Sequence, residues 1–305
     1  MLFPGKSYRG MLPPLTADET DCAERMRSDV CMLAGTIGER NTRKLLALAA
    51  AERFITQRLE HMGYSVVSEP FDANGVAVAN VIAEIAGTGR EGEIIVIGAH
   101  YDSAPGTPGA NDNASAVAGL LELAREFKDI RPARTIRLVA FANEEPPYSF
   151  TDLMGSRVHA SGARKRKEKI VAMLCLECLG VYSDAPGSQK YPPPLERFYP
   201  DTADFITFCG NLYSYLLLRK CIKEFRKTTR FPSEGLAAPE SVKGVSWSDH
   251  WSFWQEGYPA IMITDTAFFR YSHYHLPSDT PDRLDYERMA RVIGGVRRVV
   301  ERLCR

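Results

Sequence analysis

The sequence has no excess of charge of either sign. Its 38 lysines and arginines balance its 38 aspartates and glutamates over 305 residues. This balance gives no reason to expect nucleic acid or an anionic membrane as a partner. No run approaches the roughly 18 apolar residues of a membrane span, and the first ten residues lack the apolar core of a signal peptide. We therefore expect a soluble chain that binds neither nucleic acid nor a membrane.

The sequence also lacks the cysteine pattern of a disulfide-rich secreted domain. Seven cysteines are an odd number, and most lie within apolar segments. Cys175 and Cys178 have C-x-x-C spacing, but no second pair stands at zinc-ribbon spacing, so we interpret both as core thiols. The expected location is cytoplasmic, with secretion open if an export signal precedes this sequence.

Motifs of several enzyme classes are missing. The sequence has no G-x-S-x-G nucleophile elbow and no G-x-x-x-x-G-K phosphate loop. The glycines Gly87, Gly89 and Gly92 have the spacing of a dinucleotide fingerprint, but a strand follows them where that motif needs a helix. We interpret this stretch as a turn between strands.

What the sequence does contain is short apolar runs that end in polar residues. Residues 94–99 lead into His100 and Asp102, and a loop rich in glycine and proline then reaches Asp112. Such runs are typical of buried strands in a parallel sheet, where ligands gather at the carboxyl ends. Imidazole and carboxylate suit zinc, and Asp102 is placed to hold the other ring nitrogen of His100. The stretch indicates half of a metal site.

Two further apolar runs carry carboxylates. Residues 134–143 end at Glu144 and Glu145, and residues 170–178 include Glu177 among apolar neighbours. Adjacent acids raise each other's pKa unless a cation lies between them, so solvated loop acids are an equal alternative for the first pair. A lone buried carboxylate is costly unless it is paired or bound to a metal. Glu177 is therefore the more informative residue.

The six histidines differ in setting. His100 and His275 follow buried strands at positions rich in carboxylates, with His273 as the competitor of His275. His250, beside Asp249, is either a ligand or a structural residue. We interpret His61 and His159 as ordinary helical-surface residues.

The pattern of elements predicts a three-layer α/β/α fold with a central mixed, mainly parallel sheet. Residues 1–19 are expected to form an extended lead-in and residues 20–305 a single domain. Loops 183–203 and 231–246 would form the rim of the site. The expected helices are 21–36, 42–62, 114–127, 210–227 and 285–303, and the expected strands are 64–70, 76–85, 91–99, 134–143, 170–178 and 260–264.

Six motifs in register resemble the superfamily of zinc-dependent aminopeptidases and glutaminyl cyclases. They are HYDS, GANDNASA, NEEPP followed by MGS, LECLG, SDHWSFW with GYPAIMIT, and YHLPSDT. The resemblance extends from about Arg27 to Arg298. It implies a zinc-exopeptidase-like fold and a peptide substrate with a free N-terminus.

The resemblance also implies a ligand set. Two zinc ions would be bridged by Asp112, with His100 and Glu177 on one ion and Glu145 and His275 on the other. His275 is preferred to His273 because only residues 274–280 match the spacing Tyr-His, three residues, Asp-Thr.

Glu144 would be the general base and Asp102 a second catalytic residue that orients His100. A cis peptide bond is implied between Asp112 and Asn113. The chain departs from the family pattern at Glu177, where aspartate is frequent, and at Ala116, where glycine is common. Neither change removes a ligand.

Three functions remain open. The first is a dizinc aminopeptidase, the second a glutaminyl cyclase with a single zinc, and the third a non-enzymatic binding module on the same fold. Six aromatic residues are candidates either for a side-chain pocket or for the core: Tyr191, Tyr213, Trp247, Phe268, Phe269 and Tyr271.

Overall fold

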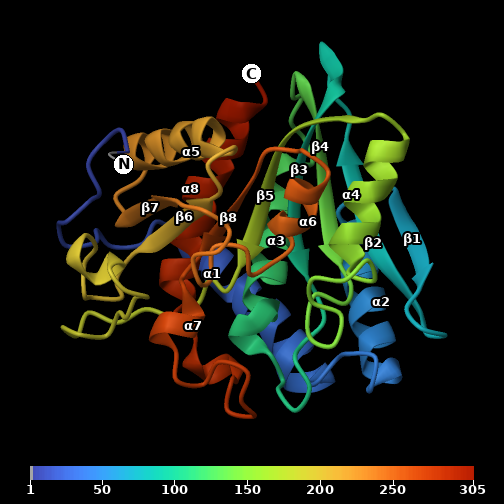
Figure 1. Ribbon diagram of the computed structural model, residues 1–305, viewed down its shortest axis with the longest axis horizontal. Helices are drawn as coiled ribbons and strands as arrows, with labels where there is room; N and C mark the ends of the chain where they lie inside the picture. The colour runs from blue at the N-terminus through green and yellow to red at the C-terminus, as the bar shows by residue number, and fades with distance from the viewer. Residues whose placement is uncertain (1–2) are drawn as a thin grey trace.

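Eight strands form one sheet in the computed structural model, which describes residues 3–305 (Figure 1). Their order across the sheet is β1-β2-β4-β3-β5-β8-β6-β7. Four neighbouring pairs are parallel and three are antiparallel, so the predicted mixed, mainly parallel sheet is confirmed. The strands are β1 (Val66–Asp72), β2 (Ala77–Ile85), β3 (Arg90–His100), β4 (Arg134–Phe141), β5 (Lys169–Glu177), β6 (Ile206–Gly210), β7 (Ser233–Ala237) and β8 (Ala260–Thr264).

Helices cover both faces of this sheet, which gives the three predicted layers (Figure 1). One face carries α1 (Ala17–Val30), α2 (Leu45–His61), α3 (Ala116–Phe127), α5 (Tyr215–Thr228) and α8 (Tyr286–Leu303). The other carries α4 (Gly155–Lys165) and α6 (His250–Gln255), and the short α7 (Ala267–Arg270) follows β8. Within residues 3–305, no helix is both long and apolar enough to span a membrane.

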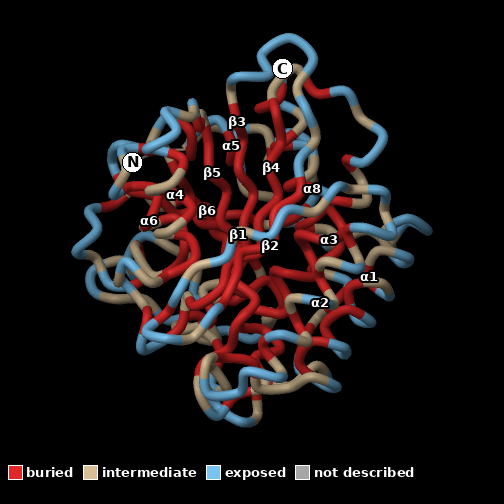
Figure 2. Tube along the Cα trace, turned by 90° about the vertical axis from the view of Figure 1, so that its right-hand side faces the viewer, coloured by how far each residue is buried: buried red, intermediate tan, exposed pale blue. Residues whose placement is uncertain are grey.

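The central strands are apolar nearly throughout because helices bury both of their sides. Ile95, Val96 and Ile97 of β3 are completely buried, and every residue of β8 is buried. Figure 2 shows buried residues concentrated along the strands and on the inner sides of the helices, with exposed residues in the outer loops. The uninterrupted apolar runs in the sequence are therefore the core of the sheet.

Two strands were not predicted, and one helix begins earlier than predicted. Residues 206–210 and 233–237 form β6 and β7, although the sequence pattern predicts no strand at the first segment and a loop at the second. Helix α1 begins at Ala17, inside the expected lead-in, because Thr16 and Glu19 form a capping box: the Thr16 hydroxyl accepts from the Glu19 N–H, and the Thr16 N–H donates to the Glu19 carboxylate. Beyond Val30 the helix continues as a π-helical segment, Cys31–Ile37.

A row of paired residues, which we call the register line, crosses four neighbouring strands. Glu177 of β5 pairs with Thr264 of β8, Thr264 with Thr207 of β6, and Thr207 with Glu234 of β7. Paired residues on neighbouring strands direct their side chains to the same face, and strands lie about 4.8 Å apart. Thr207 therefore lies roughly 10 Å across the sheet from Glu177.

Candidate metal centre

The parallel strands bring the predicted ligands to one edge of the sheet. His100 is the last residue of β3 and Glu177 the last of β5, while Glu144 and Glu145 come shortly after the end of β4. Strands that run in parallel end on the same side, so residues distant in sequence meet there. This edge is where the apolar runs of the sequence change to polar residues.

Asp112 and His275 reach this edge from loops. Asp112 lies in the turn Ala110–Ser115, where its own backbone is not helical (φ −111°, ψ 90°). The backbone there approaches Gly109 so closely that a side chain at Gly109 would collide with the carbonyl of Asp112. Gly109 also has a φ of 61°, which glycine adopts without strain. The peptide bond between Asp112 and Asn113 is cis, which confirms the prediction.

Asp112 stands between the two histidines. Its Oδ1 is 3.3 Å from His100 Nε2, and its Oδ2 is 2.9 Å from His275 Nε2. Glu177 Oε2 lies 3.3 Å from His100 Nε2, and Glu145 Oε2 lies 3.2 Å from His275 Nε2. The five side chains thus form two groups of three that share one carboxylate. The structure brings together all five residues of the expected ligand set.

Several inward-facing atoms of these groups have no hydrogen-bond partner. Among residues 3–305 they include His100 Nε2, Asp112 Oδ1, Glu145 Oε1 and His275 Nε2, all of them buried. Buried polar atoms without partners are destabilising unless something else binds them. Imidazole nitrogens and carboxylate oxygens are zinc ligands, and three per ion leave a position open for substrate. The residues present therefore fit a pair of zinc ions.

The concentration of charge changes the pKa of each group. Burial lowers the pKa of His275, but the neighbouring carboxylates of Asp112 and Glu145 outweigh it and raise that pKa to about 11. Burial and the charge of Asp112 raise the pKa of Glu145 to about 7. Burial also holds the pKa of Glu144 well above its usual range. Carboxylates and imidazoles bind metal in their deprotonated forms, so a divalent cation would take the place of these protons.

Asp102 connects the two halves of the site. Its Oδ1 lies 3.4 Å from His100 Nδ1 and accepts the backbone N–H of Glu144 at 3.0 Å. Its Oδ2 accepts the backbone N–H of Glu145 at 3.1 Å. One buried carboxylate therefore orients the imidazole and also fixes the loop after β4.

Glu177 is held by neighbours that the sequence did not reveal as functional. The Ser248 hydroxyl donates to Glu177 Oε2 at 2.7 Å, and the Asn113 amide donates to the same oxygen at 3.2 Å. The thiol of Cys178 donates to Oε1 at 3.0 Å, so this buried cysteine does more than fill the core. Ser248 lies in the SDHWSFW motif, which was the only available signal for it.

The role of Arg40 was not predicted from the sequence either. It is fully buried, and its guanidinium donates to the carbonyls of Tyr101 at 2.7 Å and Gly109 at 2.9 Å. It thereby joins the two ends of the loop between His100 and Asp112. Its segment, residues 37–41 (IGERN), also resembles the family, but nothing in it distinguishes an arginine that binds only backbone carbonyls.

The other histidines lie outside the ligand groups. His273 pairs with Ser278 at 2.8 Å, and buried His250 contacts the carbonyl of Val245 at 2.8 Å. Burial lowers the pKa of His250 to about 4, which is consistent with a structural role. The interpretation of His159 as a surface residue is wrong, because its side chain is completely buried and 2.9 Å from Glu69.

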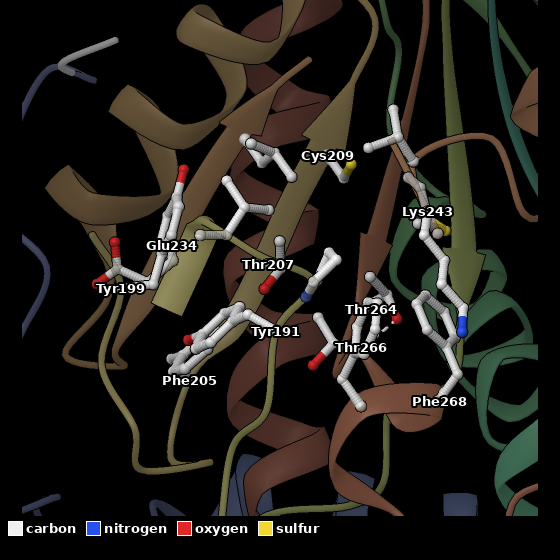
Figure 3. Close-up of a pocket in the computed structure, with 17 residues that line it drawn as sticks. Tyr191, Tyr199, Phe205, Thr207, Cys209, Glu234, Lys243, Thr264, Thr266 and Phe268 are labelled. Carbon is white, nitrogen blue, oxygen red and sulfur yellow. Dashed lines mark hydrogen bonds between the residues drawn. The ribbon is translucent and has the colours of Figure 1, made fainter. Parts of the chain in front are cut away.

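A pocket lies beside the centre (Figure 3). Both expected rim loops contribute to its lining, through Tyr191 in one and Lys243 in the other. Phe268 connects the pocket to the metal centre, because its ring contacts that of Tyr274 with centroids 6.0 Å apart, and Tyr274 stacks on His275 at 3.9 Å.

Three of the six candidate aromatic residues line this pocket, namely Tyr191, Phe268 and Phe269. Tyr213 is exposed on the surface, and Tyr271 donates instead to Asp279 at 3.0 Å. Trp247 packs against Phe268 without lining the pocket itself. Half of the six candidate aromatic residues therefore line the pocket.

Comparison with known proteins confirms the resemblance seen in the motifs. The sequence model of peptidase family M28 matches residues 80–300. The chain is 39% identical over 282 residues to the uncharacterized protein YfbL of Escherichia coli, and the match covers 90% of this chain and 86% of that one.

Solved structures share the fold. A zinc aminopeptidase from Bacillus subtilis superposes with a TM-score of 0.72 at 15% identity, over 92% of this chain and 94% of that one. A glutaminyl cyclase from Fimbriiglobus ruber superposes with a TM-score of 0.66 at 22% identity, over 96% and 97%. Both kinds of enzyme therefore share this architecture with the chain.

Proposed function

The chain belongs to peptidase family M28, and from this premise we propose that it is a dizinc aminopeptidase that removes N-terminal residues from peptides. The observation that carries the proposal is the pair of three-residue groups that share Asp112. A single carboxylate with one oxygen toward each histidine suits two ions better than one.

We assign His100, Asp112 and Glu177 to one zinc ion, and Glu145 and His275 together with Asp112 to the other. When bound, the two ions lower the pKa of water, polarise the scissile carbonyl and stabilise the oxyanion that forms on attack. Asp102, Ser248 and Asn113 keep the ligands in orientation through the hydrogen bonds described above.

Glu144 is the proton carrier of the proposed reaction. Its carboxylate lies 4.0 Å from His100 Nε2, at the centre but in neither ligand group. It takes a proton from the attacking water and delivers that proton to the leaving amine. The free α-amine of the substrate docks beside one metal position, and the pocket next to Phe268 receives the side chain of the residue that is removed.

The test compares wild type with Glu144→Gln, using Glu91→Gln as a matched control at an exposed position. We expect Glu144→Gln to lower kcat for peptide hydrolysis by at least about 100-fold and to keep its zinc, because a general base contributes roughly 10²–10⁴ in rate. Normal hydrolysis by this variant would refute the assigned base. Loss of zinc from it would refute the separation of base and ligands.

Zinc stoichiometry separates the proposal from a glutaminyl cyclase, the second candidate that the shared fold supports. Elemental mass spectrometry after zinc loading and removal of the excess should give two ions per chain. One ion per chain, together with loss of ammonia from a peptide that begins with glutamine, would favour the cyclase. Protein that retains no zinc and turns over neither substrate would favour a binding module.

A further inference from the structure

The pocket beside the metal centre has a near end and a far end. Phe268 is at the near end, because its ring contacts that of Tyr274, which stacks on His275. Glu234 of β7 lines the far end, on the opposite side of the pocket from Phe268 (Figure 3). The register line puts β7 three strands, or roughly 14 Å, from Glu177. A short substrate side chain therefore stays at the near end, and a long one extends towards the far end.

The rim loop 183–203 supplies the wall at the far end. Its side chains Tyr191, Leu195 and Tyr199 line the pocket. The Tyr199 hydroxyl donates to the carbonyl of Gly235 on β7 at 2.8 Å. The ring of Tyr191 stacks on that of Tyr199 with centroids 5.7 Å apart. A displacement of this loop would therefore move the far wall of the pocket.

Arg270, the last residue of α7, joins the two ends of this loop. Its Nη1 lies within hydrogen-bond distance of the carbonyls of Val181 at 3.1 Å, Ala203 at 3.3 Å and Phe205 at 3.0 Å. Val181 precedes the loop, Ala203 ends it and Phe205 follows it. The guanidinium carbon also lies 4.7 Å from the centroid of the Phe205 ring, which lines the pocket. One side chain thus fixes the two loop ends relative to each other.

The same guanidinium also holds the middle of the loop. Its Nε donates to the side-chain carbonyl of Gln189 at 2.7 Å, and Gln189 is buried. The side-chain amide of Gln189 donates in turn to the Thr266 hydroxyl at 3.0 Å. The backbone N–H of the next residue, Lys190, donates to the carbonyl of Phe269 at 3.1 Å, and Tyr191 of the far wall follows directly. These contacts connect the wall made by the loop to the wall made by α7.

We propose that Arg270 is a positioning residue that holds the far wall through Gln189 and so determines the affinity for N-terminal residues with long side chains; this rests on the proposed aminopeptidase function. Arginine suits this role, because its planar guanidinium donates to several fixed acceptors at once, which a lysine ammonium does not reproduce. Since the wall is ordered before the substrate binds, binding loses less conformational entropy. An N-terminal alanine does not reach this wall, so its release does not depend on Arg270.

The experiment measures kcat and KM of the zinc-loaded enzyme for Phe-Ala and Ala-Ala. In Arg270→Lys we expect KM for Phe-Ala to rise by roughly three- to tenfold, the contribution of one net hydrogen bond. The kcat for Phe-Ala, both constants for Ala-Ala and the zinc content should stay unchanged, because only binding at the far wall is lost. Arg288→Lys is the matched control and should change nothing. The Arg288 guanidinium lies over the same Tyr182 ring as that of Arg270, but it pairs with exposed Asp184.

Gln189→Leu tests the same contact from the side of the loop and leaves the carbonyl contacts of Arg270 in place. We expect the same rise in KM for Phe-Ala, and no further rise when Gln189→Leu is combined with Arg270→Lys, because two residues that act through one contact are not additive. Equal rises for both dipeptides, a similar rise in Arg288→Lys, or additive effects in the double variant would overturn the proposal.

Limited trypsin digestion of metal-free protein provides a second readout that does not depend on turnover. The loop contains two trypsin sites, Lys190 and Arg197, and Arg270→Lys neither adds nor removes a site. Cleavage at these two sites, followed by mass spectrometry, should be faster in Arg270→Lys than in wild type, because a loop that opens more often is cut more often. Equal rates would overturn the role of Arg270. If wild type cleaves neither dipeptide, the proposed aminopeptidase function is refuted instead, and the trypsin rates still test Arg270.

Discussion

Two clusters of charged side chains lie at the same sheet, one mostly buried and one partly exposed, and they differ in how their atoms are satisfied. In the metal centre, several imidazole and carboxylate atoms face one another without hydrogen bonds. In the second cluster, Arg137 bonds Glu84 at 2.5 Å and Glu168 at 2.6 Å. His159 of that cluster bonds Glu69 at 2.9 Å. We call this second group, made of Glu69, Glu84, Arg137, His159 and Glu168, the Arg137 cluster.

The difference distinguishes charged residues that can bind a metal ion from charged residues that stabilise the fold. In the Arg137 cluster, cations and anions are supplied by the protein itself, so nothing further is needed. In the metal centre, the ion-pair partners of Asp112, Glu145 and Glu177 among residues 3–305 are the two histidines, and none is a lysine or arginine. A buried, carboxylate-rich site of this kind needs an external cation to balance its negative charge. Changes in the two clusters should therefore affect different properties.

The largest expected effect is that of Asp112→Asn. The substitution puts a neutral amide in the place of the carboxylate shared by both groups. We therefore expect loss of at least one zinc ion and a fall of more than about 100-fold in kcat/KM, above the effect typical of a residue that only orients a ligand. Zinc content and dipeptide hydrolysis are measured together, and circular dichroism checks the fold. A variant that keeps both ions and its activity would contradict the shared-ligand assignment.

Arg137→Met should have the opposite profile. It leaves Glu168 and Glu84 without their common partner; because both carboxylates are partly exposed, we expect the free energy of unfolding to fall by only about 1 to 2 kcal/mol. Activity per folded molecule should not change. Urea unfolding provides the measurement, and Arg131→Met, at an exposed position, is the matched control. Reduced kcat/KM with intact stability would show that the two clusters are not independent.

Ser248→Ala tests the support of one ligand. Because the Ser248 hydroxyl donates to Glu177, its loss should weaken one zinc site by roughly 10- to 100-fold and leave the other unchanged. Chelator competition gives the two affinities. Ser252→Ala is the control, since that equally buried serine contacts Ser156 instead. Equal weakening of both sites, or weakening in the control, would count against this role.

The smallest effect concerns pH. Burial raises the pKa of the Glu168 carboxyl, but Arg137 and Arg166 outweigh it and hold that pKa at about 2. Between about pH 4.3, the ordinary glutamate value, and about pH 2, the unfolded chain binds a proton that the folded chain does not. The stabilisation is therefore complete above that window and is lost as pH falls through it.

Metal-free Arg137→Met should consequently show a weaker loss of stability than wild type between about pH 5 and pH 2. We expect a difference under about 1 kcal/mol, because Glu168 is partly exposed and solvent screens the interaction. Urea titrations of both proteins in EDTA across this range provide the test. Parallel pH profiles would show that Arg137 does not hold the pKa of Glu168.

The sequence predicted the centre of the sheet better than its edge. Strands β3, β5 and β8 are buried on both sides, so their apolar runs are unmistakable. Strand β7, with the sequence SEGLA, carries a glutamate and a glycine, and no composition rule marks it as a strand. Its pairing with β6 depends on tertiary contacts that a single sequence does not display.

The site likewise has residues that the sequence predicted and residues that it did not. Ligand types and motif spacing indicated where His100 and Glu177 would meet, because both end buried strands. Arg40 and Ser248 act through backbone carbonyls and a single hydroxyl, so neither residue type indicates its role, and only the SDHWSFW motif marks the position of Ser248. The single domain and the cytoplasmic location stay predictions.

The register line from Glu177 to Glu234 also bears on how this enzyme can change over evolution. Because its members stand on separate strands, Thr207 of the pocket wall is adjacent neither in sequence nor in the sheet to any metal ligand. A mutation at Thr207 therefore changes the pocket wall without replacing a residue of either ligand group. Such a layout lets the pocket vary one residue at a time while the ligand set is kept.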